Sequence, residues 1–94
     1  MRKNNYKIMK SEIVKNISYV KLSKHRTKVL LTLDYKLKFP SDIAKEINLP
    51  LSDVSRALRG LKDRKLVVCL NEEDSQGRLY KITEQGKNII SYLE

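Results

Sequence analysis

The chain opens with apolar residues spaced three and four positions apart, which is the period of one face of an α-helix. This stripe covers about residues 5–22, and its members are Tyr6, Met9, Ile13, Ile17 and Val20. Ser23 can cap a second helix. The apolar positions of this second helix are Val29, Leu30, Leu33 and Leu37. Phe39 and Pro40 end it, because proline disfavours the helical conformation in the residue before it.

Two shorter helices are predicted next, each after a serine of the type that caps helices. Ser41 precedes a short helix, and Ser52 begins a longer one that extends to about Arg64. The apolar residues of the short helix are Ile43, Ala44 and Ile47, and those of the 52–64 helix are Val54, Ala57, Leu58 and Leu61. A turn at 48–51 separates them, so the pair predicts a helix-turn-helix unit.

The pattern after Lys65 alternates instead of following a helical period. Residues 66–70 and 78–83 predict two strands joined by a polar loop of about six to eight residues, which together form a β-hairpin. Thr83 is expected to cap a last helix, which Gly86 near its start weakens slightly. The predicted fold is mainly α with a β-hairpin (α+β), in the order α-α-α-α-β-β-α of a winged helix-turn-helix.

Size and composition narrow the classes of protein. The 94 residues suit one domain, and the 40% hydrophobic content supplies a core. The single cysteine, Cys69, excludes an internal disulfide, and with the single histidine, His25, it leaves too few ligands for a structural zinc site. Apolar runs are too short to span a bilayer and no signal-peptide pattern opens the chain. We therefore expect a cytoplasmic protein without metal or cofactor.

Positive charge is concentrated in the first part of the chain. The formal net charge is +9; residues 1–38 carry 11 basic and 2 acidic residues, whereas residues 39–94 carry 9 of each. A second local cluster of cations consists of Arg56, Arg59, Lys62, Arg64 and Lys65. Such clusters suit binding to a polyanion, and the alternative is that they are ordinary solvated helix faces.

The 52–64 helix has a polar and basic face opposite its apolar one. Its members are Ser52, Asp53, Ser55, Arg56, Arg59 and Lys62. An α-helix fits the major groove of DNA, where serine hydroxyls and the bidentate arginine fork can contact base edges. We therefore predict base readout by Ser55, Arg56 and Arg59. Contacts to phosphates are expected from Lys24, Lys28 and Lys62 and from the helix starts at Ser41 and Ser52.

The predicted hairpin has an acidic tip. Glu72, Glu73 and Asp74 would be repelled by a phosphate backbone, so Arg78 is the wing residue expected to contact DNA, in the minor groove or at a phosphate. The alternative is an ion pair of Arg78 with Asp74 or Glu73 inside the wing.

Several short motifs occur together over about residues 23–94. They are SKHR (23–26), PSDIAKEINL (40–49), VSRAL (54–58), LK (61–62), LV (66–67), GRLY (77–80) and ITEQGK (82–87). The set resembles winged-helix regulators of the MarR/ArsR type, and most closely their small archaeal representatives. The resemblance implies that helix 52–64 reads an operator, that the hairpin is the wing and that the terminal helices form a homodimer. Lys65 departs from the glycine that usually closes the recognition helix, so the turn there must be closed differently or be strained. The wing departs too, because Asp74 and Arg78 are separated by three residues.

Two apolar stripes lack an obvious partner within one small winged helix. Their members are Met9, Ile13, Ile17 and Val20 near the N-terminus and Ile89, Ile90 and Leu93 near the C-terminus. A two-fold dimer would cover both and place two recognition helices about one DNA turn, ~34 Å, apart. We therefore expect residues 1–22 to be a dimerisation element and residues 23–94 a DNA-binding domain. The alternative is that the N-terminal helix folds back and completes a monomeric core.

No catalytic set is predicted. His25 lies on a basic helix face, as an exposed residue or a phosphate contact, and Cys69 alternates within an apolar strand as a small buried residue. A glycine-rich phosphate loop and the paired cysteines of metal-sensing ArsR relatives are both missing. We expect no enzyme but a sequence-specific regulator that binds double-stranded DNA as a homodimer. The alternatives are a protein-interaction module and a non-specific nucleic-acid binder, RNA included; no residue pattern identifies a small-molecule effector.

Overall fold

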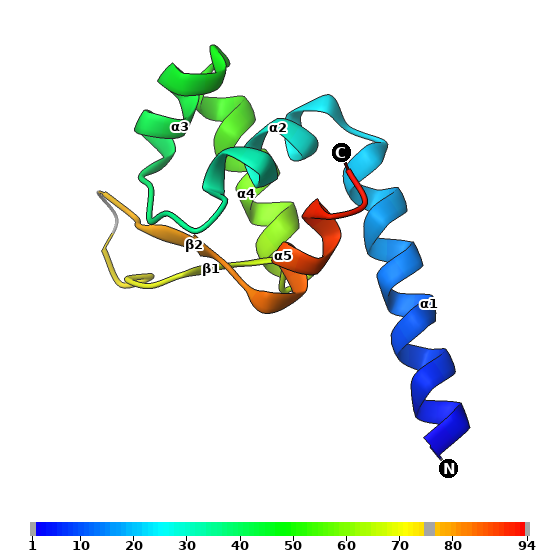
Figure 1. Ribbon diagram of the computed structural model, residues 1–94. Helices are drawn as coiled ribbons and strands as arrows, with labels where there is room; N and C mark the ends of the chain where they lie inside the picture. The colour runs from blue at the N-terminus through cyan, green and yellow to red at the C-terminus, as the bar shows by residue number, and fades with distance from the viewer. Residues whose placement is uncertain (1, 75–76, 94) are drawn as a thin grey trace.

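The computed structural model describes residues 2–74 and 77–93, with residues 2–10 described as backbone only. Its elements are α1 (Arg2–Lys21), α2 (Lys24–Leu33), α3 (Pro40–Ile47), α4 (Leu51–Asp63), β1 (Val67–Cys69), β2 (Tyr80–Ile82) and α5 (Glu84–Ile90). This order confirms the predicted winged helix (Figure 1). None of the described helices combines the length and the apolar composition needed to cross a membrane.

The core lies where α2, α3 and α4 pack together against the hairpin and α5. Its largest fully buried side chains include Leu30, Leu33, Ile43, Leu58 and Leu61 from the three central helices. These are the apolar positions that the helical periods predict, so the burial of one face of each helix stabilises the domain. α1 extends away from this core toward the N-terminus (Figure 1).

Two of the four predicted serine and threonine caps are confirmed. The Ser23 hydroxyl oxygen accepts from the Arg26 backbone N–H at 3.2 Å, at the start of α2. The Thr83 hydroxyl oxygen accepts from the Gly86 backbone N–H at 3.1 Å, at the start of α5. Each bond satisfies an amide that the first turn of a helix leaves without an internal partner.

The caps predicted at Ser41 and Ser52 are wrong. α3 already begins at Pro40 and α4 at Leu51, and neither helix has a side-chain cap bond. Proline explains the shift at α3, because its fixed φ suits the first helical position and its missing N–H needs no acceptor there. In α4 a proline stands just before the helix, with Pro50 at the N-cap.

Leu37 is not part of α2, contrary to the prediction. The helix ends at Leu33, and Tyr35 turns the chain with a φ of 65°. Leu37 is consequently 51% exposed. The segment that follows is extended instead, and Lys38 pairs with Tyr80 through backbone bonds of 3.1 and 3.0 Å. The extended residue Lys38 therefore lies beside β2 as a short third segment next to the two strands of the hairpin.

A polar cluster fixes this extended segment to α2 and α3. The Lys38 ammonium group lies 2.5 Å from the Glu46 carboxylate, which also accepts from the Thr32 hydroxyl at 2.7 Å. Hydrogen bonding to Lys38 and then to Thr32 lowers the pKa of Glu46. The three side chains come from α2, the extended segment and α3, so the cluster connects the two helices through their linker.

The two strands form a short antiparallel hairpin. The register pairs Val67 with Ile82 and Cys69 with Tyr80, and all four side chains are buried. Burial of Cys69 confirms its predicted role as a small core residue. Each strand has three residues, so the loop is longer than the predicted six to eight residues.

The turn between α4 and β1 is closed by a lysine in a left-handed conformation. Lys65 has a φ of 64°, and its backbone N–H donates to the Lys62 carbonyl at 2.9 Å. The next amide, that of Leu66, donates to the Leu61 carbonyl at 3.0 Å. The left-handed conformation costs a residue other than glycine about 1–2 kcal/mol of conformational energy. The turn is thus closed in the left-handed conformation that a glycine would adopt, so the expectation of a strained turn is confirmed and that of a different closure is wrong.

Candidate nucleic-acid interface

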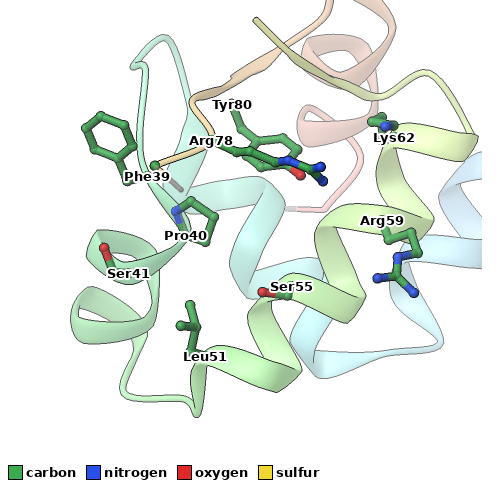
Figure 2. A pocket seen from close by; sticks show the side chains of 10 residues that line it. Phe39, Pro40, Ser41, Leu51, Ser55, Arg59, Lys62, Arg78 and Tyr80 are labelled. Atoms are coloured by element: carbon green, nitrogen blue, oxygen red, sulfur yellow. The ribbon is translucent and has the colours of Figure 1, made fainter. Parts of the chain in front are cut away.

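A groove of about 400 Å³ lies between α4, the start of α3 and the wing. Five of the predicted DNA-contacting residues line it, namely Ser41, Ser55, Arg59, Lys62 and Arg78. Figure 2 shows Ser55, Arg59 and Lys62 on successive turns of α4, with Arg78 on the wing side of the same groove. Residues from three separate segments, predicted one by one from their chemistry, are therefore brought to one surface.

The groove also has apolar walls that the sequence pattern does not predict. Phe39, Leu51 and Tyr80 line it, and the first two are 40% and 51% exposed. Apolar side chains in this position suit contact with sugars or with the methyl group of thymine. In the sequence Phe39 precedes Pro40 and Leu51 follows Pro50, and these positions indicate helix boundaries and not a binding surface.

Arg56 lies outside this groove, although it was grouped with Arg59 in the prediction. Its guanidinium is 3.6 Å from the Asp53 carboxylate, and its side chain is 79% exposed. Together with His25 and Arg26 it lines a smaller hollow at the start of α2. The cause is helical geometry, because positions 55 and 59 share a face and position 56 is turned by about 100° from position 55.

The remaining predicted phosphate contacts lie on exposed surface. Ser52 is exposed near the start of α4, and Lys24 and Lys28 are exposed on α2. Their positions leave them accessible to a polyanion, but they do not line the groove.

Lys62 reaches from α4 to the wing. Its ammonium group forms an ion pair with the Glu72 carboxylate. The two side chains are also hydrogen-bonded, and this bond is the largest cause of the raised pKa of Lys62 and of the lowered pKa of Glu72. One of the acidic groups at the wing tip is thus directed to a cation of α4.

Arg78 contacts the wing through the backbone. Its Nε donates to the Asp74 carbonyl oxygen at 3.1 Å. Within residues 2–74 and 77–93, neither the Asp74 nor the Glu73 carboxylate pairs with it. Asn71 orders the same loop, since its side-chain oxygen accepts from the Leu79 amide at 2.7 Å and its amide group donates to the Gly77 carbonyl at 3.0 Å.

The structure corrects the predicted dimerisation set at two positions. Val20 and Ile89 are fully buried in the core of the chain itself, so they have no surface left for a partner. Their helices pack against the domain, with α1 on α2 and α5, and this uses their innermost residues. The other members of the set whose side chains are described, namely Ile13, Ile17, Ile90 and Leu93, are only partly buried against the core. The side chain of Met9 lies outside the described residues.

Comparison with known proteins identifies relatives in fold only. No family model and no curated protein sequence matches the chain. NMB1585, a MarR family regulator from Neisseria meningitidis, matches with a TM-score of 0.69 and 25% identity, over 96% of this chain and 65% of its own. Reduced HlyU from Vibrio cholerae matches with a TM-score of 0.69 and 18% identity, over 99% of this chain and 94% of its own.

ZitR from Lactococcus lactis, solved in complex with DNA, matches with a TM-score of 0.64 and 18% identity. The match covers 73% of this chain and 48% of ZitR, so the chain spans about half the length of that protein. The structural neighbours are thus winged-helix transcriptional regulators of the MarR/ArsR type, as the motifs suggested. The resemblance to archaeal members in particular stays a prediction.

Proposed function

We propose that this chain is a transcriptional regulator that binds duplex DNA sequence-specifically as a homodimer, with α4 in the major groove. The observation that carries the proposal is the groove in which Ser55, Arg59 and Arg78 meet. The similarity of the fold to that of ZitR, which was solved in complex with DNA, supports the same function. Selection of binding sites from random duplex DNA is the experiment that tests it.

The proposed division of labour follows from position. Ser55 and Arg59 occupy the groove-facing turns of α4 and would contact base edges. Arg56 lies outside the groove on the same helix and would contact the DNA from beside it. Arg78 and the first turn of α3, which includes Ser41, would contact phosphates around them, and Lys62 would do so when it is released from Glu72. The exposed lysines on α2, Lys24 and Lys28, would add sequence-independent affinity.

We further propose that the dimer forms through α1 and α5. Ile13 and Ile17 lie on α1, and Ile90 and Leu93 lie in or just after α5; all four are only partly buried. Val14 on α1 is 57% exposed. A second copy would cover this apolar surface and place two recognition helices about 34 Å apart. Sedimentation at micromolar concentration is expected to give twice the chain mass of 11.0 kDa, and a single chain mass would contradict the dimer.

Replacing Glu72 with glutamine is expected to strengthen binding to DNA of any sequence by about threefold, because it frees Lys62 for a phosphate. The slope of log affinity against log salt should steepen by about 0.9, the contribution of one added phosphate contact. The measurement is a titration of fluorescent random duplex at several salt concentrations.

Glu73→Gln is the matched control, because it removes the same charge from the same exposed tip. Among the described residues Glu73 has no ion pair with Lys62. Equal gains from both variants would mean that only the overall charge of the tip matters. A loss of affinity in Glu72→Gln would mean that the ion pair holds the wing in its binding position.

A further inference from the structure

Tyr19, near the end of α1, is enclosed by two arginines from other elements. The guanidinium carbon of Arg26, in the first turn of α2, lies 3.8 Å from the centre of the Tyr19 ring. That of Arg64, at the end of α4, lies 4.2 Å from it. Both distances are within the range of cation–π attraction. The ring therefore connects three helices.

Hydrogen bonds hold both arginines in place beside the ring. Arg26 donates from Nη1 to the Tyr19 backbone carbonyl at 2.9 Å. Arg64 donates from Nη1 to the side-chain oxygen of Asn16 at 3.4 Å, one turn earlier on α1. The Thr27 hydroxyl donates to the Val20 carbonyl at 3.0 Å, so the α1–α2 junction is fixed at a second point. The position of the Tyr19 ring is thus determined from both sides.

Gly60 explains how close the ring comes to α4. A Cβ atom added at Gly60 would overlap the Tyr19 hydroxyl oxygen and would lie 3.3 Å from its Cζ. Glycine inside a helix lowers helix stability relative to alanine, so its presence at this position matches the need for room. The tip of the Tyr19 ring consequently lies against the backbone of the recognition helix, next in sequence to Arg59.

We propose that Tyr19 is a positioning residue that sets the placement of the recognition helix relative to α1, and thereby the spacing of DNA half-sites. This inference rests on the proposed homodimer. In the proposed dimer α1 would contact the partner copy through Ile13 and Ile17, whereas α4 would contact the base edges of the DNA. The contact between Tyr19 and Gly60 joins these two functions, because it is a rigid ring against a helix backbone and not a flexible chain.

The contact itself is tested by a double-mutant cycle with Gly60→Ala and Tyr19→Ala, followed by thermal unfolding. With Tyr19 present, Gly60→Ala is expected to lower the Tm, because the methyl group displaces the ring. With Tyr19→Ala, the same change is expected to raise the Tm, because alanine favours the helix. The same sign in both backgrounds would show that the ring does not press on α4.

The functional role is tested with duplexes that carry two selected half-sites at the best spacing and at one base pair more or less. Tyr19→Ala is expected to reduce the discrimination between these spacings by about fivefold, with the affinity for a single half-site unchanged. Tyr19→Phe keeps the ring between the arginines but removes the hydroxyl that lies against Gly60, and its discrimination should lie between those of the wild type and Tyr19→Ala. Gly60→Ala leaves Tyr19 in the chain but displaces it, and should behave like Tyr19→Ala.

Tyr35→Ala is the matched control, since Tyr35 also lies under a cation, with Lys87 4.9 Å from its ring centre. It is expected to leave the spacing preference unchanged. Unaltered discrimination in folded Tyr19→Ala and Gly60→Ala overturns the positioning role and leaves the proposed function standing. A wild-type chain without any half-site preference overturns both, and the thermal cycle then still reports on the contact alone.

Discussion

Replacing Gly86 with alanine is expected to destabilise the protein by about 3 kcal/mol, the upper end of the usual cost of overpacking. A Cβ at this position would overlap the backbone carbonyl oxygen of Leu66 and would lie 2.6 Å from Cγ1 of Ile82. The first atom belongs to the backbone beside β1 and cannot rotate away. The first turn of α5 would therefore have to move off the hairpin, and its Thr83 cap with it.

The sign of this effect is opposite to the one that helix propensity alone predicts. Alanine for glycine inside a helix normally gains about 1 kcal/mol, and the sequence indicated only a slightly weakened helix. Chemical denaturation monitored by circular dichroism measures the change. Asn88→Ala, at an exposed position of the same helix, is the control and is expected to be neutral or stabilising. A Gly86→Ala variant as stable as the wild type would mean that α5 does not pack closely on the hairpin.

Replacing Arg59 with alanine is expected to weaken binding to the preferred DNA site by about 1–3 kcal/mol, which is roughly fivefold to a hundredfold or more. Arg59 lines the groove, and within the part of the chain that the structure describes no carboxylate forms an ion pair with it. Its guanidinium is therefore available to a guanine edge, whose two acceptors match its two parallel donors. Affinity for unrelated DNA should change little.

The measurement compares dissociation constants on the selected site and on a scrambled duplex at one salt concentration. Arg56→Ala is the matched control, because Arg56 is on the same helix but pairs with Asp53 outside the groove. We expect a smaller loss of specificity from that change. An equal loss on both duplexes in Arg59→Ala would identify Arg59 as a phosphate contact instead.

Element order could be predicted from the sequence because the hydrophobic period changes clearly at Lys65. Helical stripes before it and alternation after it each reflect one buried face, and the described stripe residues other than Leu37 lie in the core or pack against it. The sequence also indicates a departure at Lys65, because a helix must be closed there without glycine, but it does not indicate that the lysine itself adopts the left-handed conformation. Helix starts were less predictable, because Pro40 and Pro50 compete with the serines that follow them.

Tertiary contacts explain what the sequence could not reveal. Whether Gly86 is a weak helix residue or a necessary gap depends on Leu66 and Ile82, which are distant in sequence. Tyr19 lies outside the apolar stripe of its helix and looks like an ordinary surface residue until Gly60 and the two arginines are placed around it. The pairing of Lys62 with Glu72 also crosses from helix to wing, so neither local pattern indicates it.

Sequence-specific DNA binding by this chain is measured by selecting binding sites from a pool of random duplex DNA at about physiological salt and sequencing the bound fraction. We expect enrichment of an inverted repeat whose half-sites are about one helical turn apart. Binding without enrichment would contradict sequence-specific readout and leave a backbone binder. No binding at all would contradict the DNA-binding function and favour a winged helix that contacts other proteins.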